Sequence, residues 1–192
     1  MNKNDFINEL NKIGVTLSEH QLNQLDKYYN MLVEYNKNVN LTAITEYNQV
    51  LLKHFYDSLT LTKAIELTNQ KICDIGTGAG FPGIVLKIAY PNLEITLVES
   101  LTKRCVFLNE VIKELDLKNI KVVNQRAEEF SQNNIEYFDI ITSRAVAKLN
   151  ILLELSIKSL KIGGYYIALK ANVDEEIKSI STCLTKLNAS LE

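Results

Sequence analysis

Cysteine is scarce in this sequence, which has three among 192 residues, at Cys73, Cys105 and Cys183. An odd number without a repeated Cys-x-x-Cys spacing argues against a disulfide framework and predicts no metal site. Cys73 lies in a strongly apolar stretch and is expected to be a small core residue. Free thiols of this kind are typical of a reducing compartment, so we expect a cytoplasmic protein.

Long apolar runs and an excess of one charge are also missing. Polar residues follow Met1, so no signal segment is expected, and no apolar stretch reaches the roughly 20 residues of a membrane-spanning helix. The formal net charge of −2 excludes a protein-wide basic field, so any nucleic acid would have to bind a local patch. The length and the hydrophobic content of 46% predict one α/β domain with a substantial core.

Glycine is rare as well, but four of the seven glycines fall in one stretch, Gly76-Thr77-Gly78-Ala79-Gly80-Phe81-Pro82-Gly83. The preceding residues, 71–75, predict a short buried strand, and a helix is expected to begin near Pro82. Glycine allows a positive φ and lets a ligand approach the main chain, while a helix start offers free N–H groups. The stretch therefore predicts a nucleotide-type ligand site above a parallel sheet.

Two registers of these glycines suggest different ligands. Gly78-x-Gly80-x-x-Gly83 fits the dinucleotide fingerprint, a weak pattern that here starts two residues late. Asp74-x-Gly76-x-Gly78-x-Gly80 resembles motif I of methyltransferases that bind S-adenosylmethionine (SAM). SAM carries a positive amino group and a positive sulfonium, so an acid at the mouth of the loop favours it over a pyrophosphate. A glycine-rich turn without any ligand is the remaining interpretation.

The first 69 residues predict a helical region, and residues 70–192 predict the ligand-binding core, the two packed as one unit. Ser18 and Gln21 have the spacing of a capping box at the start of the second helix. Apolar residues at helical spacing predict helices over 5–13, 18–35 and 46–66.

His54 and Asp57 lie three residues apart in the third of these helices, so they share one face. They are candidates for the lip of the ligand pocket. The alternative is an ordinary pair of polar residues on a helix surface.

Strands and helices alternate in the rest of the chain. Strands are expected at 71–75, 94–99, 119–124, 138–142 and 165–170, helices at 83–90, 102–115, 148–160 and 174–187, and a turn at Gly163-Gly164. This order predicts a parallel sheet covered by helices on both faces. Ligands of such sheets bind at the carboxyl ends of the strands.

Several polar residues follow the expected strands. Glu99 ends the second strand, where an acid can accept hydrogen bonds from both ribose hydroxyls of SAM or NAD; it can also simply begin a helix. After the third strand, the backbone of Ala127 and the carboxylate of Glu128 are candidates for contact with an adenine edge, unless they belong to a solvated charge run. Arg144 follows the fourth strand and Lys170 ends the fifth.

Basic residues are expected to converge at this edge of the sheet. Lys103 and Arg104 begin the helix after the second strand and join Arg144 and Lys170. Such a group suits a phosphate-bearing substrate. A scattered set of solvated cations is equally consistent with the sequence.

Several segments resemble the RsmG (GidB) family of bacterial 16S rRNA methyltransferases. Phe81-Pro82-Gly83 and Ser143-Arg144-Ala145 are more specific than motif I itself. The matching segments, in the order of the family, are Asn40-Leu41-Thr42, Lys53 to Leu59, Asp74 to Gly83, Lys103-Arg104, Arg126-Ala127-Glu128, Ser143-Arg144-Ala145 and Ala168-Leu169-Lys170.

The resemblance implies a class I SAM-dependent methyltransferase with a Rossmann-like sheet and an N-terminal helical extension. It implies methylation of N7 of a guanosine in the decoding-site loop of 16S rRNA. We expect the partner to be 16S rRNA or a small-subunit particle, bound through a local basic patch, and the protein to be a monomer. SAM contacts are implied at Gly76, Phe81, Ala127, Glu128 and Arg144. To these, the motif and the strand ends add Asp74, Gly78 and Glu99.

Methylation at guanine N7 needs no general base, because N7 has an in-plane lone pair. Catalysis would consist mostly of alignment and desolvation, so no acid–base pair is expected. We identify no certain catalytic residue, and the candidates for substrate positioning are Arg144, Lys170, His54 and Asp57.

The chain departs from the family at its C-terminal end. Sheets of the family continue with an antiparallel pair of strands, which we expect to be missing here, leaving an exposed sheet edge. A SAM-binding but inactive protein therefore stays an alternative, as does a methyltransferase with another substrate. An NAD-dependent oxidoreductase would need a catalytic domain that nothing after residue 170 supplies.

Overall fold

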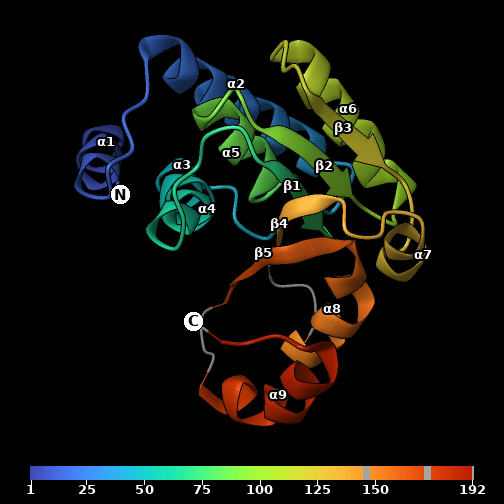
Figure 1. Ribbon diagram of the computed structural model, residues 1–192. Coiled ribbons are helices and arrows are strands. Elements are labelled where there is room, and N and C mark those ends of the chain that lie inside the picture. The colour runs from blue at the N-terminus through green and yellow to red at the C-terminus, as the bar shows by residue number, and fades with distance from the viewer. Residues whose placement is uncertain (145–147, 171–173, 192) are drawn as a thin grey trace.

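A computed structural model describes residues 1–144, 148–170 and 174–191. Its centre is a five-stranded sheet in the order β3-β2-β1-β4-β5, and every neighbouring pair of strands is parallel (Figure 1). The strands are β1 (Lys71–Ile75), β2 (Glu94–Val98), β3 (Ile120–Val123), β4 (Phe138–Arg144) and β5 (Leu160–Leu169). They follow one another along the chain as predicted. The chain adds β2 and β3 on one side of β1 and then crosses to the other side, where it adds β4 and β5.

The central strands are buried on both faces. In β1 and in β2, the first residue is half-buried and the following four are buried. Continuous apolar runs of this kind are what a parallel sheet requires when helices cover both of its faces. Because the strand order reverses beside β1, the carboxyl ends of β1 and β4 form the edge where a ligand site is expected.

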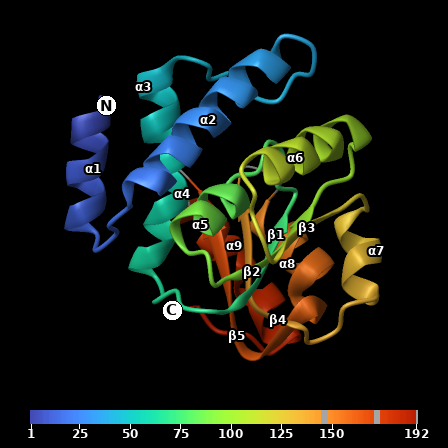
Figure 2. The ribbon, with the colours of Figure 1, turned by 90° about the horizontal axis from the view of Figure 1, so that it is seen from above.

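Helices lie on both faces of the sheet (Figure 2). On one face, α5 (Gly83–Ala89) and α6 (Thr102–Glu114) contact the strands β1 to β3, and α2 (Glu19–Asn36) packs over both helices. On the other face lie α7 (Ala127–Gln132) and α8 (Leu149–Ser156). The last helix, α9 (Asp174–Leu187), packs on α8.

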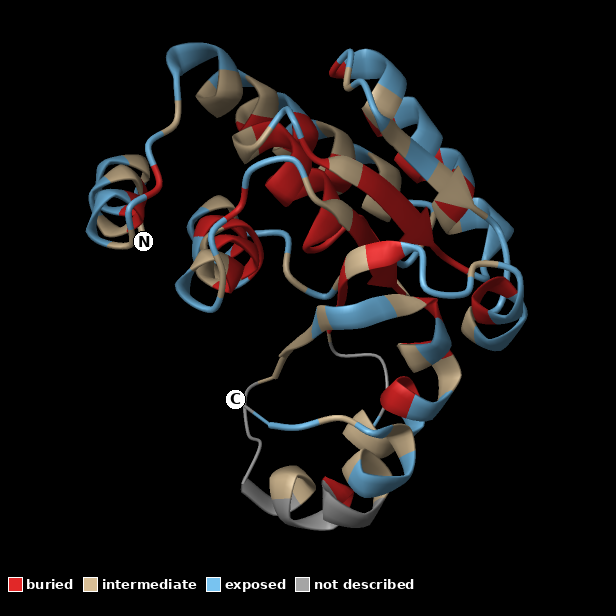
Figure 3. Cartoon of the chain, viewed as in Figure 1, coloured by how far each residue is buried: buried red, intermediate tan, exposed pale blue. Residues whose placement is uncertain are grey.

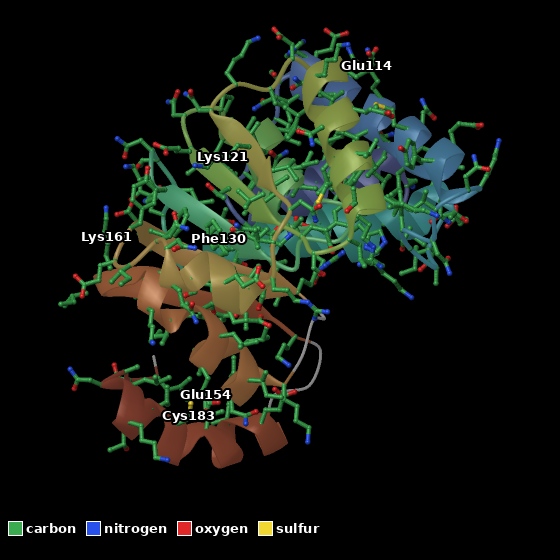
Figure 4. All side chains as sticks on the ribbon, turned by 90° about the vertical axis from the view of Figure 1, so that its right-hand side faces the viewer. Glu114, Lys121, Phe130, Glu154, Lys161 and Cys183 are labelled. Carbon is green, nitrogen blue, oxygen red and sulfur yellow. The ribbon has the colours of Figure 1, made fainter. Side chains whose placement is uncertain are left out.

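Side chains from α7, α8 and α9 show this second layer in Figure 4. Phe130 of α7 is buried and packs against Phe138, with ring centroids 5.9 Å apart and the rings tilted by 34°. Glu154 of α8 and Cys183 of α9 are labelled in the same view, and Cys183 Sγ is 3.9 Å from the carbonyl oxygen of Asn150 in α8. In the described part of the chain, no helix is long and apolar enough to cross a membrane.

The predicted capping box is confirmed at the start of α2. The backbone N–H of Gln21 donates to Ser18 Oγ at 3.3 Å, and the N–H of Ser18 donates to Gln21 Oε1 at 2.8 Å. The helix α1 (Lys3–Lys12) also agrees with the sequence pattern.

The helix predicted over 46–66 is present over residues 47–63, but it is not a regular α-helix. The segment divides into α3 (Tyr47–Val50), the π-helical turn η1 (Leu51–Tyr56), α4 (Asp57–Leu59) and the 3₁₀ turn η2 (Thr60–Lys63). Two carbonyl oxygens of η1 accept hydrogen bonds from side chains. Arg144 Nη1 donates to Lys53 O at 2.8 Å, and Ser58 Oγ donates to His54 O at 2.6 Å. Such insertions disturb a regular hydrogen-bond ladder, and the first partner lies 91 residues away, where no local pattern predicts it.

One hydrophobic core joins the N-terminal helices to the sheet layer. The fully buried ring of Tyr28 in α2 packs against Phe55, Phe81 and Phe107, with ring centroids 5.5 to 6.4 Å apart. Figure 3 shows the buried residues concentrated in β1, β2, α5 and the η1–α4 segment. The boundary between residues 69 and 70 stays a prediction about sequence organisation.

The turn predicted at Gly163-Gly164 is wrong, because both residues lie inside β5. The register moves from Phe138 opposite Leu160 to Ile140 opposite Tyr165, so β5 contains extra residues there. Gly163 has φ +78°, and a Cβ on Gly164 would lie 2.8 Å from the carbonyl oxygen of Asp139. The two glycines therefore lie in a β-bulge whose backbone packs closely against β4.

β5 forms one of the two edges of the sheet, and β3 forms the other. None of the residues of β5 is fully buried, and Ile162 is 89% exposed. Among the described residues, no further strand pairs with it, in agreement with the expected exposed edge.

Candidate functional site

A cavity of about 580 Å³ lies at the carboxyl ends of β1, β2 and β4. The glycine loop after β1 forms its floor, and residues from η1, α6 and α7 form its sides. Of the site residues predicted from the sequence, those that line it are His54, Gly76, Gly78, Phe81, Glu99, Ala127, Glu128 and Arg144.

The glycines of the loop have two different roles. Gly76 and Gly78 have positive φ, and a Cβ on Gly78 would meet only the Gly76 carbonyl oxygen at 3.9 Å. By contrast, a Cβ on Gly80 would lie 2.6 Å from Ile84 and 2.7 Å from Tyr28 Oη, and one on Gly83 would collide with Leu97. Gly78 therefore leaves main chain open toward the cavity, as close approach of a ligand requires, while Gly80 and Gly83 allow tight packing.

Asp74 lies beneath the glycine loop rather than at its mouth, which corrects the expected position. It is fully buried, and its Oδ2 accepts hydrogen bonds from Thr77 Oγ1 at 2.6 Å and from the N–H of Gly83 at 2.9 Å. Burial raises its pKa to about 6. Oδ1 is buried and has no hydrogen-bond partner among the described residues. Asp74 thus ties β1 to the loop and to the start of α5.

Glu99 connects the end of β2 to the same loop. Its carboxylate is almost completely buried and accepts the N–H of Gly78 at 3.1 Å and the N–H of Leu101 at 2.8 Å. Arg104 Nη1 lies 3.5 Å from Glu99 Oε2. Each carboxylate oxygen can accept two hydrogen bonds, so the group retains capacity toward the cavity.

Ala127 and Glu128 begin the short helix α7 on the side wall of the cavity. The sequence suggested only a segment after the third strand, and it missed this helix. The Glu128 side chain is exposed, and no described residue hydrogen-bonds to it. Both positions are open to a partner in the cavity.

Arg144 lies between the sheet and the N-terminal helical region. Its Nη1 donates to Lys53 O at 2.8 Å and lies 3.1 Å from Asp57 Oδ2, and its Nη2 is 3.0 Å from His54 Nδ1. The guanidinium also stacks over the ring of Phe81, with Cζ 4.9 Å from the ring centre. The structure therefore brings together three of the four positioning candidates, Arg144, His54 and Asp57.

Lys170 is not part of this group. Its Nζ donates to Glu176 Oε1 at 2.9 Å, and the residue does not line the cavity. The expected convergence of basic residues therefore includes Arg104 and Arg144 but leaves Lys170 on the α9 side of β5.

Two residues of the site were missed by the sequence reasoning. Thr42 lines the cavity, and its Oγ1 lies 2.9 Å from His54 Nε2. Tyr28, far away in α2, donates a hydrogen bond from its hydroxyl to the carbonyl oxygen of Ala79 in the glycine loop. The segment Asn40-Leu41-Thr42 was the only signal for the first, and nothing local indicated the second.

An open parallel sheet with a glycine loop after β1 and a buried acid after β2 defines a class I SAM-dependent methyltransferase fold. The chain resembles a precorrin-6y C5,15-methyltransferase from Geobacter metallireducens with a TM-score of 0.55 and 19% identity, covering 69% of this chain and 70% of that one. It also resembles a SAM-dependent methyltransferase from Aquifex aeolicus with a TM-score of 0.53 and 16% identity, covering 74% and 82%.

Residues 21–190 match the family model of rRNA small subunit methyltransferase G (GidB), so the chain belongs to this family. The ribosomal RNA small subunit methyltransferase G of Lysinibacillus sphaericus is 47% identical, over the whole of this chain and 82% of the relative. The protein of the same name from Lachnoclostridium phytofermentans is 49% identical, over 97% of this chain and 79% of the relative. These relatives are therefore longer than the chain.

Proposed function

We propose that this protein transfers the methyl group of SAM to N7 of a guanosine in the decoding-site loop of 16S rRNA. One observation carries the proposal: the residues that the family resemblance implies as SAM contacts line a single cavity at the carboxyl ends of the central strands. An enzyme acting on the small ribosomal subunit would work in the bacterial cytoplasm.

The residues of the cavity fit SAM. The open main chain at Gly78, beside Gly76 on the cavity wall, suits the amino acid part of the cofactor, and Glu99 suits the ribose hydroxyls. Ala127 and Glu128 begin α7, where a backbone N–H and a carboxylate suit the adenine edge. The dinucleotide alternative is less suitable, because the buried carboxylate of Asp74 accepts the N–H of Gly83 at the start of α5, where it opposes a pyrophosphate.

The chemistry requires positioning rather than proton transfer. SAM, when bound, supplies a methyl group on a sulfonium, and guanine N7 has the lone pair to accept it. The chain must hold the base in line with that methyl group and exclude water. Phe81 and Arg144 form the cavity wall that would hold the base and exclude water, because their stacked side chains lie between η1 and the loop. We assign the positioning to Arg144 rather than to Lys170, which Glu176 engages outside the cavity.

The RNA would approach through the basic residues at the rim of the cavity. Arg104 and Arg126 line it, and Lys103 is exposed beside Arg104 at the start of α6. In the part of the chain that the structure describes, no acidic side chain pairs with Lys103 or Arg126. Unpaired cations of this kind are available to phosphates.

The first test is a calorimetric titration with SAM, with NAD as the control ligand. Methyl transfer from tritiated SAM to small ribosomal subunits that lack the modification follows, and the label is mapped to guanine N7. SAM binding with label at N7 is expected. NAD binding without SAM binding would overturn the cofactor, and label in another base or in a protein would overturn the substrate.

The RNA face is tested by two charge reversals on one helix. Lys103 and Lys113 are both exposed on α6, but ten residues at 1.5 Å per residue place Lys113 about 15 Å farther along the axis. Lys103→Glu should weaken subunit binding and lower the slope of log affinity against log salt by about 1, whereas Lys113→Glu should leave both unchanged. Equal effects of the two variants would contradict the proposed face.

A further inference from the structure

The side chain of His54 is a buried ring held on three sides. Its Nε2 lies 2.9 Å from Thr42 Oγ1, and its Nδ1 lies 3.0 Å from Arg144 Nη2. The ring also stacks on Phe81, with centroids 4.5 Å apart and an interplanar angle of 22°. These partners come from the segment before α3, from the end of β4 and from the glycine loop, so one ring joins three parts of the site.

The hydrogen-bond partners determine where the proton of the ring lies. A guanidinium has only donors, so Nδ1 must accept from Arg144. The remaining N–H is then on Nε2, which donates to Thr42 Oγ1; that oxygen also accepts the N–H of Ile44 at 3.1 Å. The carbonyl oxygen of Lys53 lies 3.0 Å from Nδ1 and accepts Arg144 Nη1; with Nδ1 as an acceptor, it receives no hydrogen bond from the ring.

The charges around His54 favour the same neutral form. Burial and the Arg144 cation lower its pKa to about 4, against smaller opposing contributions from Lys53 O and the Asp57 carboxylate. Thr42 and Phe81, its other neighbours, carry no charge. A protonated ring would lose its acceptor and would bring a second positive charge to 3.0 Å from the guanidinium.

We propose that His54 is a positioning residue that acts as a neutral imidazole with its proton on Nε2. Its Nδ1 fixes the Arg144 guanidinium and its face fixes the Phe81 ring, so that both present a preformed wall to SAM. The residues that form this wall are far apart in the sequence: His54 in η1 and Arg144 in β4 are separated by 90 positions. This inference rests on the proposed function for the identity of the ligand.

The tautomer can be observed directly by long-range ¹H–¹⁵N NMR of the labelled protein without SAM. The chain has two histidines, and His20 in α2 provides an exposed comparison ring in the same spectrum. We expect His54 to be neutral at pH 7, with the proton on Nε2. A proton on Nδ1, or a charged ring at pH 7, would overturn the inference whether or not the protein binds SAM.

The positioning role is tested by SAM titration of three variants. His54→Ala should weaken SAM binding about tenfold, since it leaves donors of Arg144 without their acceptor. His54→Asn offers an amide oxygen as a permanent acceptor in place of Nδ1 and should recover most of the affinity, while His20→Ala should match the wild type. Unchanged binding by His54→Ala would overturn the role.

Thermal unfolding of each variant is the control that shows whether it folds. If His54→Ala does not fold, the His54→Asn titration decides: near-wild-type affinity supports the role, and a loss as great as tenfold contradicts it. A wild-type protein that fails to bind SAM would instead overturn the proposed function, while the NMR result would still decide the tautomer.

Discussion

The half of the sheet that carries the glycine loop and the half that contains β5 are both built from parallel strands. They differ in how many contacts from distant side chains fix the backbone. The loop is held from three directions, by Asp74 below it, by Tyr28 from α2 and by Glu99 from β2. β5 is half-exposed along its length, contains a bulge and forms one edge of the sheet. The cavity lies on the half where distant side chains fix the backbone, which is what a preformed binding site requires.

The largest contrast should come from the same substitution in both halves. Gly80 and Gly163 both have positive φ, at +102° and +78°, so alanine strains either backbone. Only at Gly80 would the new Cβ also collide, with Ile84 and with the hydroxyl of Tyr28, whereas at Gly163 it meets nothing within 4 Å. We expect Gly80→Ala to lower the free energy of unfolding by about 3 kcal/mol or more and Gly163→Ala by about 1 kcal/mol.

Urea unfolding of the two variants measures this difference. Equal losses would mean that the loop is no more tightly packed than the bulge, and the comparison of the two halves would fail.

The second contrast concerns pH, because two buried groups of the loop half have opposite effects. His54 has a pKa of about 4, below its usual 6.5, so only the unfolded chain takes up this proton between these values and stability falls as the pH falls. Asp74 has a pKa of about 6, above its usual 3.8, so the folded chain holds that proton longer and stability rises as the pH falls. At about 1.4 kcal/mol per pH unit, each contribution is roughly 3 kcal/mol and the two nearly cancel.

Asp74→Asn should therefore expose the contribution of His54. Between pH 6.5 and 4, we expect this variant to lose about 3 kcal/mol more stability than the wild type, as measured by urea unfolding at several pH values. The double variant Asp74→Asn/His54→Asn is the control and should lose this extra dependence. A wild type and an Asp74→Asn variant with parallel pH curves would contradict the assignment.

A smaller contrast compares two cations of the sheet. Arg144 is 15% exposed and binds His54, Asp57 and a carbonyl oxygen, whereas Lys161 of β5 pairs with Asp139 at 2.6 Å near the surface. Arg144→Ala should cost about 2 kcal/mol of stability and weaken SAM binding at least tenfold, because the buried ring of His54 and the carbonyl oxygen of Lys53 lose their donor. Lys161→Ala should cost less than about 1 kcal/mol and leave SAM binding unchanged.

Unfolding and calorimetry are both needed for this pair. Unchanged SAM affinity in Arg144→Ala would remove Arg144 from the proposed site, even if the variant were less stable.

The smallest effect on the free energy of unfolding is expected at the β5 edge of the sheet. Ile162 is 89% exposed, so Ile162→Thr removes little buried surface and should change the free energy of unfolding by no more than about 0.5 kcal/mol. A loss of more than about 2 kcal/mol on urea unfolding would show that this part of β5 is covered in solution, against the description of an open edge.

The sequence predicted the elements that depend on neighbours in the chain. The capping box at Ser18 and the strand over residues 71–75 were confirmed, because their signals lie within a few residues. The turn at Gly163-Gly164 was wrong because paired glycines indicate a turn or a bulge equally, and only the pairing with β4 decides between them.

The candidate site divides in the same way. Glu99 and the loop glycines were identified because motif spacing and strand ends place them. Asp74 was identified too, but its position beneath the loop depends on Gly83 and Thr77 folding around it. His54 and Asp57 were read as one face of a regular helix, and their common partner Arg144 was not anticipated.

The sequence by itself determined the class of the fold, the loop after β1 and the family, because these are recorded in local patterns and in motifs. Only the tertiary structure decided how the cavity is held: the contacts of Tyr28 with Ala79 and of Arg144 with His54 join residues 51 and 90 positions apart. Hydrogen bonds between distant segments depend on how whole layers pack, and the periodic pattern of a segment shows which of its faces is buried but not which distant residue meets it.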